Sequence, residues 1–283
     1  MRSLCPNFVW LVLLQLVPAL LWAQTSPPNG EESPKTSQFV SPCRIETILP
    51  RMASHAKEFV ENVNRFTATE VLERERLDGK GKLKDKVSGS THFVTTIRQM
   101  GTGIPTVEEY RDETRLRSFD GAIEATGIPA LVLIFHPSHF EEFDMTCEGP
   151  ADWNAHSTWQ VRFQQRLDKP ATMTSLSVGS NCFRILLKGS AWIDRDTYQL
   201  LHIEVDLLEP IPAIGLNLLH QSVDYEPVTF FKNERTLWLP RRAEVTADFK
   251  ARRLVERRTY KEFRLFWVDT TQKIGEPIVF LSN

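Results

Sequence analysis

The sequence lacks the short motifs that identify the common classes of enzyme and metal-binding protein. No Cys-x-x-Cys pair is present, which excludes a structural zinc site or a thioredoxin-type redox site of the usual spacing. The G-x-S-x-G turn of serine hydrolases, the P-loop and the Rossmann glycine pattern are also missing. The sequence therefore gives no positive sign of an enzyme, and we expect no cofactor and no metal.

The sequence also lacks an excess of either charge. Its 34 Lys and Arg nearly balance its 36 Asp and Glu, for a net charge of −2, whereas a general nucleic-acid binder is normally clearly basic. Basic residues cluster locally at Arg252-Arg253 and Arg257-Arg258. In a sheet protein such a run favours a solvated edge or outer face over a phosphate contact. We therefore expect no nucleic-acid partner.

One apolar run, Phe8–Leu21, stands near the start of the chain, after Arg2 and before the small residue Ala23. This pattern predicts a cleavable signal peptide over residues 1–23, with an uncleaved anchor as the alternative. Residues 24–43 are rich in Ser, Pro, Thr and Glu without an apolar period, which predicts a flexible linker. A single folded domain is then expected over residues 44–283, in the periplasm or secreted.

Three cysteines remain after the predicted cleavage, which leaves room for one disulfide and one free thiol in an oxidising compartment. Cys147 and Cys182 each lie at an end of a strand-like segment. We therefore expect them to form the disulfide, with Cys43 left over.

Two segments have helical character. Ile45–Phe66 carries apolar residues at three- and four-residue steps, which predicts a long amphipathic helix. Pro50 leaves open whether the regular helix begins before it. Ile123–Ile134 is predicted as the second helix, and Pro129 leaves open whether the helix begins only there. Its stretch IPALVLIF is apolar nearly all round, so it must be buried.

The rest of the domain reads as antiparallel strands. In Gly189–Leu208 a turn at residues 194–197 joins two strands, and Leu201, Ile203, Val205 and Leu207 alternate with polar residues, as in a sheet with one covered face. Strands are expected at Thr69–Leu77, Thr91–Met100, Val107–Glu113, Phe140–Thr146, Thr158–Leu167, Cys182–Lys188, Leu216–Phe231, Leu237–Phe249 and Arg252–Val268. The predicted fold class is α+β, mainly β: a half-open antiparallel β-barrel of about ten to eleven strands covered by two helices.

Several residues that could do chemistry have simpler explanations. His136-Pro137-Ser138-His139 lacks the His-Glu-x-x-His spacing of a metal site, and Pro137 breaks the helix that such a site needs. Asp194 and Asp196 lie in the predicted hairpin turn, where Asp is favoured for its hydrogen bonds to the backbone. We assign no catalytic residue.

Several strand and turn signatures recur through the second half of the chain. They are G-S-A-W-I-D at 189–194, L-H-I-E at 201–204, V-D-Y at 223–225 with P-V at 227–228, L-W-L-P at 237–240 with A-E-V at 243–245, and Y-K-E-F-R at 260–264. Together they resemble the LolA/LppX family of exported lipoprotein and lipid carriers, including its uncharacterised bacterial branch. The resemblance covers about a third of the chain. It implies a half-open barrel, closed by helices, that holds acyl chains in an apolar concavity. The chain departs from the carriers in its length, its charged early strands and its lack of a lipidated cysteine.

The expected function is that of an exported, non-enzymatic carrier or binding protein. Its expected partners are a lipid or acylated protein, together with an envelope membrane or membrane protein. The expected apolar lining consists of Phe59, Val63, Leu131, Leu133, Phe135, Trp159, Phe163, Trp192, Leu201, Ile203 and Phe230.

Two other hypotheses stay open at this point. If the helices seal the apolar face completely, the domain is an envelope protein-binding or structural module that uses an exposed sheet edge. If His136, His139 or His156 shares a cleft with a carboxylate, the protein is an exported hydrolase with an unrecognised site.

Overall fold

A computed structural model describes residues 43–63, 66–99, 105–111, 127–169, 175–178, 181–230 and 235–265. The chain divides into two units, 1–41 and 42–283, and all of these residues belong to the second. The predicted signal peptide and nearly all of the predicted linker lie outside the described residues. None of the helices in the described part is long and apolar enough to cross a membrane.

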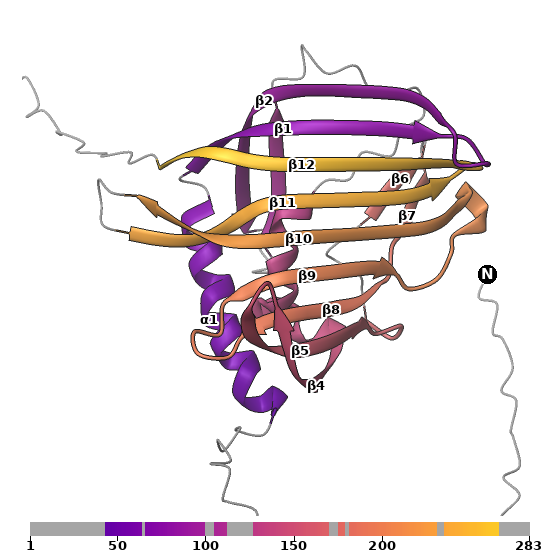
Figure 1. Cartoon of the computed structure of the whole chain (residues 1–283). Helices are drawn as coiled ribbons and strands as arrows, with labels where there is room; N and C mark the ends of the chain where they lie inside the picture. The colour runs from indigo at the N-terminus through magenta and orange to yellow at the C-terminus, as the bar shows by residue number, and fades with distance from the viewer. Residues whose placement is uncertain are drawn as a thin grey trace, which may run out of the picture. The chain divides into compact units, whose positions relative to one another are not determined.

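Ten antiparallel strands form one open sheet, in the order β3-β2-β1-β12-β11-β10-β9-β8-β5-β4 (Figure 1). The strands are β1 (Phe66–Leu77), β2 (Leu83–Gln99), β3 (Pro105–Arg111), β4 (Phe143–Trp153), β5 (His156–Gln165), β8 (Leu187–Asp194), β9 (Leu200–Leu207), β10 (Leu216–Phe230), β11 (Arg235–Phe249) and β12 (Arg252–Leu265). A second sheet pairs β6 (Ser175–Val178) with β7 (Asn181–Arg184). The predicted half-open, mainly β architecture is confirmed, and the ten strands of the main sheet agree with the ten to eleven that were predicted.

Neighbours in the sheet are mostly neighbours in sequence, because short turns join antiparallel strands directly. Two pairings are exceptions. β5 pairs with β8, although β6 and β7 lie between them in sequence, and β1 pairs with β12, which brings the first and last described strands together. Among the described strands, β3 and β4 form the two edges, so the barrel stays open.

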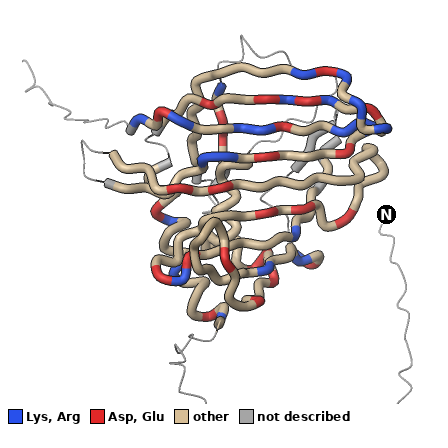
Figure 2. The backbone as a smooth tube through the Cα atoms, viewed as in Figure 1, with Lys and Arg blue, Asp and Glu red and all other residues tan. Residues whose placement is uncertain are grey.

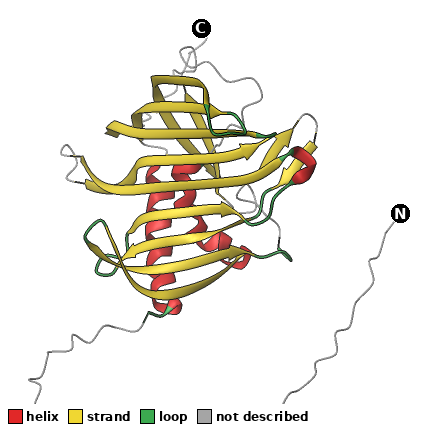
Figure 3. Cartoon of the chain, turned by 45° about the vertical axis from the view of Figure 1, so that its right-hand side comes forward, coloured by secondary structure: helices red, strands yellow, loops and turns green. Residues whose placement is uncertain are grey.

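One α-helix, α1 (Ile45–Val63), lies against the sheet (Figure 3). Its buried stripe of Ile48, Met52, Ala56 and Phe59 follows the predicted spacing. The helix begins at Ile45 and runs through Pro50. Because Pro50 lacks an amide hydrogen, the helix forgoes one backbone hydrogen bond near its start.

The second predicted helix is a tight 3-10 segment, η2 (Ile128–Phe135), and its predicted start at Ile123 lies outside the described residues. Gly127 precedes it in the left-handed conformation, with φ of 77°, and Pro129 stands in its first turn. All eight residues of η2 are buried, which confirms the prediction for IPALVLIF. Two further short helices, η3 (Pro137–Glu142) and η4 (Pro212–Ile214), connect strands.

The region around β4 differs from the prediction. The strand begins at Phe143, because Pro137–Glu142 forms η3, and it extends past the predicted end at Thr146 as far as Trp153. A register shift between Cys147 and Gly149 allows this extension. Gly149 has a φ of 134°, a conformation that favours glycine.

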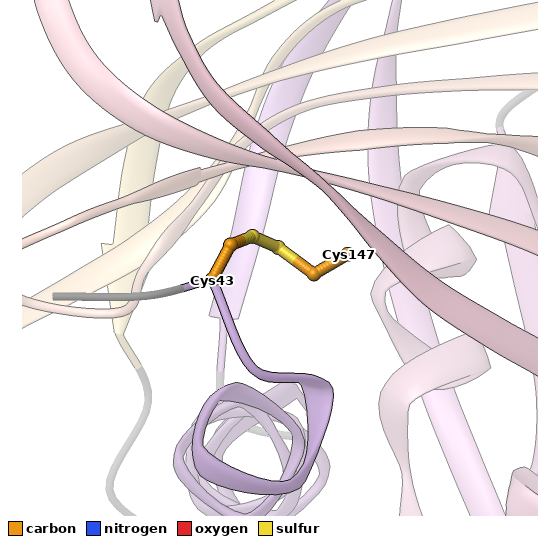
Figure 4. The surroundings of a disulfide bond; sticks show 2 residues. All are labelled: Cys43 and Cys147. Carbon is orange, nitrogen blue, oxygen red and sulfur yellow. A yellow bond between two sulfur atoms is a disulfide. The ribbon is translucent and has the colours of Figure 1, made fainter. Parts of the chain in front are cut away.

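The disulfide joins Cys43 to Cys147, with their Cα atoms 5.8 Å apart, so the predicted Cys147–Cys182 pair is wrong (Figure 4). Cys147 lies half-buried on β4, and the start of α1 passes beside that strand and brings Cys43 to it. Cys182 belongs to the separate β6–β7 sheet. The spacing of the strands along the chain could not show that the residues before α1 lie beside the edge strand β4.

We expect a Cys43→Ala/Cys147→Ala double variant to lose about 2 to 3 kcal/mol of unfolding free energy in urea, because the disulfide closes a long loop. The sequence separation of the two cysteines is 104 residues. A Cys182→Ala variant keeps the bond and serves as the control. Peptide mapping without reductant that found Cys182 in the cross-link would contradict this pairing.

Candidate functional site

The inner face of the sheet is divided into an apolar half and an ionic half. Over β5 and β8–β11 it is apolar and covered by α1 and η2, which pack on each other. Over β1, β3 and β12 it carries charged side chains that are buried. In Figure 2 residues of both signs follow β1 and β12. This division places an apolar compartment next to a polar one.

Most of the predicted lining residues meet in the apolar half. Seven belong to one buried cluster with η2 and the sheet, namely Phe59, Leu131, Leu133, Phe135, Trp159, Phe163 and Ile203. Phe230 is half-buried against the same cluster. The side chain of Val63 lies outside the described residues.

Trp192 and Leu201 do not join this cluster. A register shift between Trp192 and Ile193 pairs Ile193 with Leu200, so Leu200 takes the core position predicted for Leu201. Trp192 instead packs against His202, on which Trp153 stacks with ring centroids 3.8 Å apart. A strict period of two could not reveal this bulge.

The space left between α1, η2 and the sheet is small. A cavity of about 30 Å³ lies there, which is about one water molecule's share of liquid volume and far less than a typical ligand pocket. Its walls are Met52, His55, Glu58, Phe59, Asn62, Val132, Tyr198, Gln199, Leu200, Tyr225, Leu237, Trp238 and Leu239. In this conformation η2 occupies the concavity that an acyl chain would need.

Tyr225 ties η2 to the sheet. Its hydroxyl donates a hydrogen bond to the Pro129 carbonyl oxygen at 3.0 Å and accepts one from the Val132 amide at 3.1 Å. Burial raises the pKa of Tyr225, so the phenol stays protonated and keeps both roles. At the start of η2 the Gly127 amide donates to the Glu109 carboxylate at 2.9 Å.

His55 connects α1 to the turn between β8 and β9. Its Nε2 lies 3.0 Å from the Thr197 carbonyl oxygen, and its Nδ1 lies 3.0 Å from the Gln199 amide nitrogen. Arg51 lies over the Tyr198 ring, 5.7 Å from its centroid. The helix is therefore attached to this turn as well as to β4 through the disulfide.

The ionic half contains a buried cluster that the sequence did not suggest. Glu70, Glu109, Arg111 and Arg258 have side chains 0 to 10% exposed. Arg111 Nε donates to Glu70 at 2.6 Å and its terminal nitrogen lies 2.7 Å from Glu109. Burial would lower the pKa of Arg111, but its hydrogen bond to Glu70 and the nearby carboxylates raise it, so the guanidinium stays charged.

Arg258 contradicts the prediction of a solvated basic edge. Its side chain is 1% exposed and pairs with Glu256, whereas that of Arg257 is 47% exposed on the other face. Alternation places consecutive residues of a strand on opposite faces, so only one of the two arginines faces solvent. The missed signal is that Glu70 and Arg74 lie on one face of β1. There they meet Arg258 and Glu256 of β12.

His139 and His156 each pair with a carboxylate, at separate places in the fold. His139 pairs with Glu142 at 3.0 Å and is 1% exposed, whereas the exposed His156 pairs with Asp194 at 3.5 Å. Asp194 accepts hydrogen bonds from the Asp196 and Thr197 amides, which confirms its role in the turn. Among the described residues no group of three His, Cys, Asp or Glu is placed to hold a metal ion.

An open ten-stranded antiparallel sheet around an amphipathic helix and a buried apolar segment is the architecture that the sequence resemblance implied. No family model matches the sequence, and no curated protein matches it.

Three solved structures are similar in fold. A predicted outer membrane lipoprotein-sorting protein domain from Vibrio parahaemolyticus is 10% identical, with 82% of this chain and 95% of that chain covered and a TM-score of 0.44. A DUF1329 family protein from Desulfovibrio piger is 10% identical, with 78% and 92% covered and a TM-score of 0.42. A LolA superfamily protein from Nitrosomonas europaea is 9% identical, with 79% and 94% covered and a TM-score of 0.38. We transfer no ligand or residue role from them.

Proposed function

We propose that the protein is an exported, non-enzymatic carrier or binding protein for lipids or lipidated proteins, whose acyl chains take the place of η2. The observation that carries the proposal is η2 itself. It is an entirely apolar segment, separate from the sheet strands, that fills the concavity in an irregular 3-10 conformation with a kink at Ala130. The hydrogen bonds of a 3-10 helix are poor, so such a segment is displaced more easily than a strand.

The energetics favour binding with release. An acyl chain of about 14 methylenes gains roughly 11 kcal/mol on burial, at about 0.8 kcal/mol each. Displacing η2 and immobilising the ligand offset part of this gain. The closed form, in which η2 fills the concavity, thus lowers the affinity for lipid. A carrier that must deliver its cargo requires such a limited affinity.

The proposed location is the periplasm or the outside of the cell, reached through a signal peptide over residues 1–23. A disulfide between Cys43 and Cys147 suits an oxidising compartment. The proposed partners are then a lipid or acylated protein and an envelope membrane or membrane protein that supplies or receives it.

The test is lipid binding by wild-type protein and a Tyr225→Phe variant. Loss of the two hydrogen bonds to η2 shifts the equilibrium towards the open form, in which η2 has left the concavity. We therefore expect the variant to bind a fluorescent phospholipid about tenfold more tightly. The same variant unfolds at a lower urea concentration. Mass spectrometry of the native wild-type protein is expected to find co-purified lipid.

Tyr110→Phe is the matched control, because Tyr110 is 50% exposed on β3 and its hydroxyl donates to the half-buried Glu108. It leaves affinity and stability unchanged. Protein that is free of lipid as purified, and that binds no phospholipid in either form, would exclude a carrier.

The small cavity favours a second candidate, a protein-binding module with a sealed core. The edge strands β3 and β4 would then add a partner strand through their free backbone groups. In that case Tyr225→Phe loses stability without gaining any affinity for lipid.

A further inference from the structure

Two hydroxyl groups in the ionic half are buried without a hydrogen-bond partner among the residues that the structure describes. They belong to Tyr260 on β12, 0% exposed, and Thr95 on β2, 1% exposed. A buried hydroxyl without a partner is unfavourable, and Phe or Val would fill the same space without that cost. Packing alone therefore does not account for either hydroxyl.

Both hydroxyls lie among the buried charges. Tyr260 is the register partner of Glu70, and Thr95 is the register partner of Glu109. The Tyr260 ring packs on the Phe93 ring with their centroids 5.1 Å apart. The Arg111 guanidinium lies over the same Phe93 ring, 5.1 Å from its centroid. Burial raises the pKa of Tyr260 well above its ordinary value, so its hydroxyl keeps its proton and is a donor.

The charges around these hydroxyls balance. Glu70 and Glu109 face Arg111 and Arg258, with Arg258 3.8 and 3.7 Å from the two carboxylates. A ligand with a single charge of either sign would leave a buried charge uncompensated, which is costly. A ligand group that carries one charge of each sign keeps the balance.

The ionic cluster also contacts the start of the segment that fills the apolar half. The Gly127 amide, immediately before η2, donates to Glu109 at 2.9 Å. A ligand that displaces η2 removes this contact and leaves Glu109 free to accept another donor. The polar end of such a ligand is then brought to the cluster while its chains occupy the apolar half.

We propose that this cluster binds the zwitterionic headgroup of a phospholipid, an inference that rests on the proposed lipid-binding function. Arg111 and Arg258 hold the phosphate, Glu70 and Glu109 hold the ammonium group, and the Tyr260 and Thr95 hydroxyls complete the hydrogen bonds. Guanidinium groups suit phosphate because their paired N–H groups match its oxygens.

The experiment compares phosphatidylethanolamine, phosphatidylglycerol and diacylglycerol with identical acyl chains, offered together to the full-length protein and quantified by native mass spectrometry. Wild type is expected to prefer phosphatidylethanolamine about tenfold, since hydrogen bonds to charged groups are the stronger kind. Tyr260→Phe and Thr95→Val are expected to lose most of this preference. Each variant is at least as stable as wild type, because the group removed has no partner.

The outcomes separate the two proposals. Equal binding of all three lipids, or a preference for phosphatidylglycerol, overturns the headgroup site and leaves acyl-chain binding intact. Binding of none of them overturns lipid carriage itself. Variants that are less stable than wild type but keep its preference show that the hydroxyls are structural, which also overturns the headgroup site.

Discussion

Gly189→Ala is expected to lower the unfolding free energy by about 3 to 4 kcal/mol, because no space exists for a methyl group at this position of β8. A Cβ atom there would overlap the Glu204 carbonyl oxygen of β9 and lie 2.6 Å from Cζ of Phe163 on β5. The first neighbour is backbone, and Phe163 is fully buried, so neither moves without opening the sheet. Urea unfolding followed by fluorescence measures the loss.

Gly79→Ala is the matched control. Its nearest contact would be the Ala251 carbonyl oxygen at 3.6 Å, which is ordinary van der Waals distance. We expect a change within about 0.5 kcal/mol for this surface position. Equal stability of the two alanine variants would show that β5, β8 and β9 do not pack as closely as the structure has them.

The hairpin that contains Gly189 also shows what the sequence predicts well. The turn at Asp194 and the two strands around it follow from alternation and from the preference of Asp for turns, and both are confirmed. Ile203, Val205 and Leu207 face the core as predicted. These features are local, so the identities of neighbouring residues determine them.

Features that depend on distant residues were predicted less well. The Cys43–Cys147 disulfide and the bulge that exchanges Leu200 for Leu201 depend on which segments meet in space. The burial of η2 was predicted from its composition. The volume of the cavity between α1, η2 and the sheet depends on side-chain packing. The periodicity of the sequence does not predict that packing.

The ionic half was missed for a similar reason. Charged residues on β1 and β12 look like solvated faces when each strand is read alone. They become buried because β1 pairs with β12 and lies two strands from β3 in the same sheet. This arrangement places carboxylates against guanidinium groups from distant parts of the chain. Only the pairing of strands reveals that these charges compensate one another.

Arg258→Met is expected to lower the unfolding free energy by about 3 to 5 kcal/mol, the largest effect that we predict. Arg258 pairs with Glu256 and lies within 4 Å of Glu70 and Glu109, all of them buried. The substitution keeps the volume of the side chain but leaves buried carboxylates without their cation. Arg257→Met, one residue away on the exposed face, removes surface ion pairs to Glu75 and Glu244 and costs at most about 1 kcal/mol.

The difference in unfolding free energy between Arg258→Met and wild type is expected to decrease at acid pH. Burial would raise the pKa of Glu256, but Arg258 and Arg74 together lower it below its ordinary value of 4.5. The unfolded chain therefore takes up protons at a higher pH than the folded one, so this stabilisation is present above about pH 4.5 and is lost as the pH falls further. Urea titrations from pH 7 to pH 3 should show the gap between the two proteins narrowing at the acid end. A gap that stayed constant, or a loss no larger than that of Arg257→Met, would mean that Arg258 does not compensate buried carboxylates.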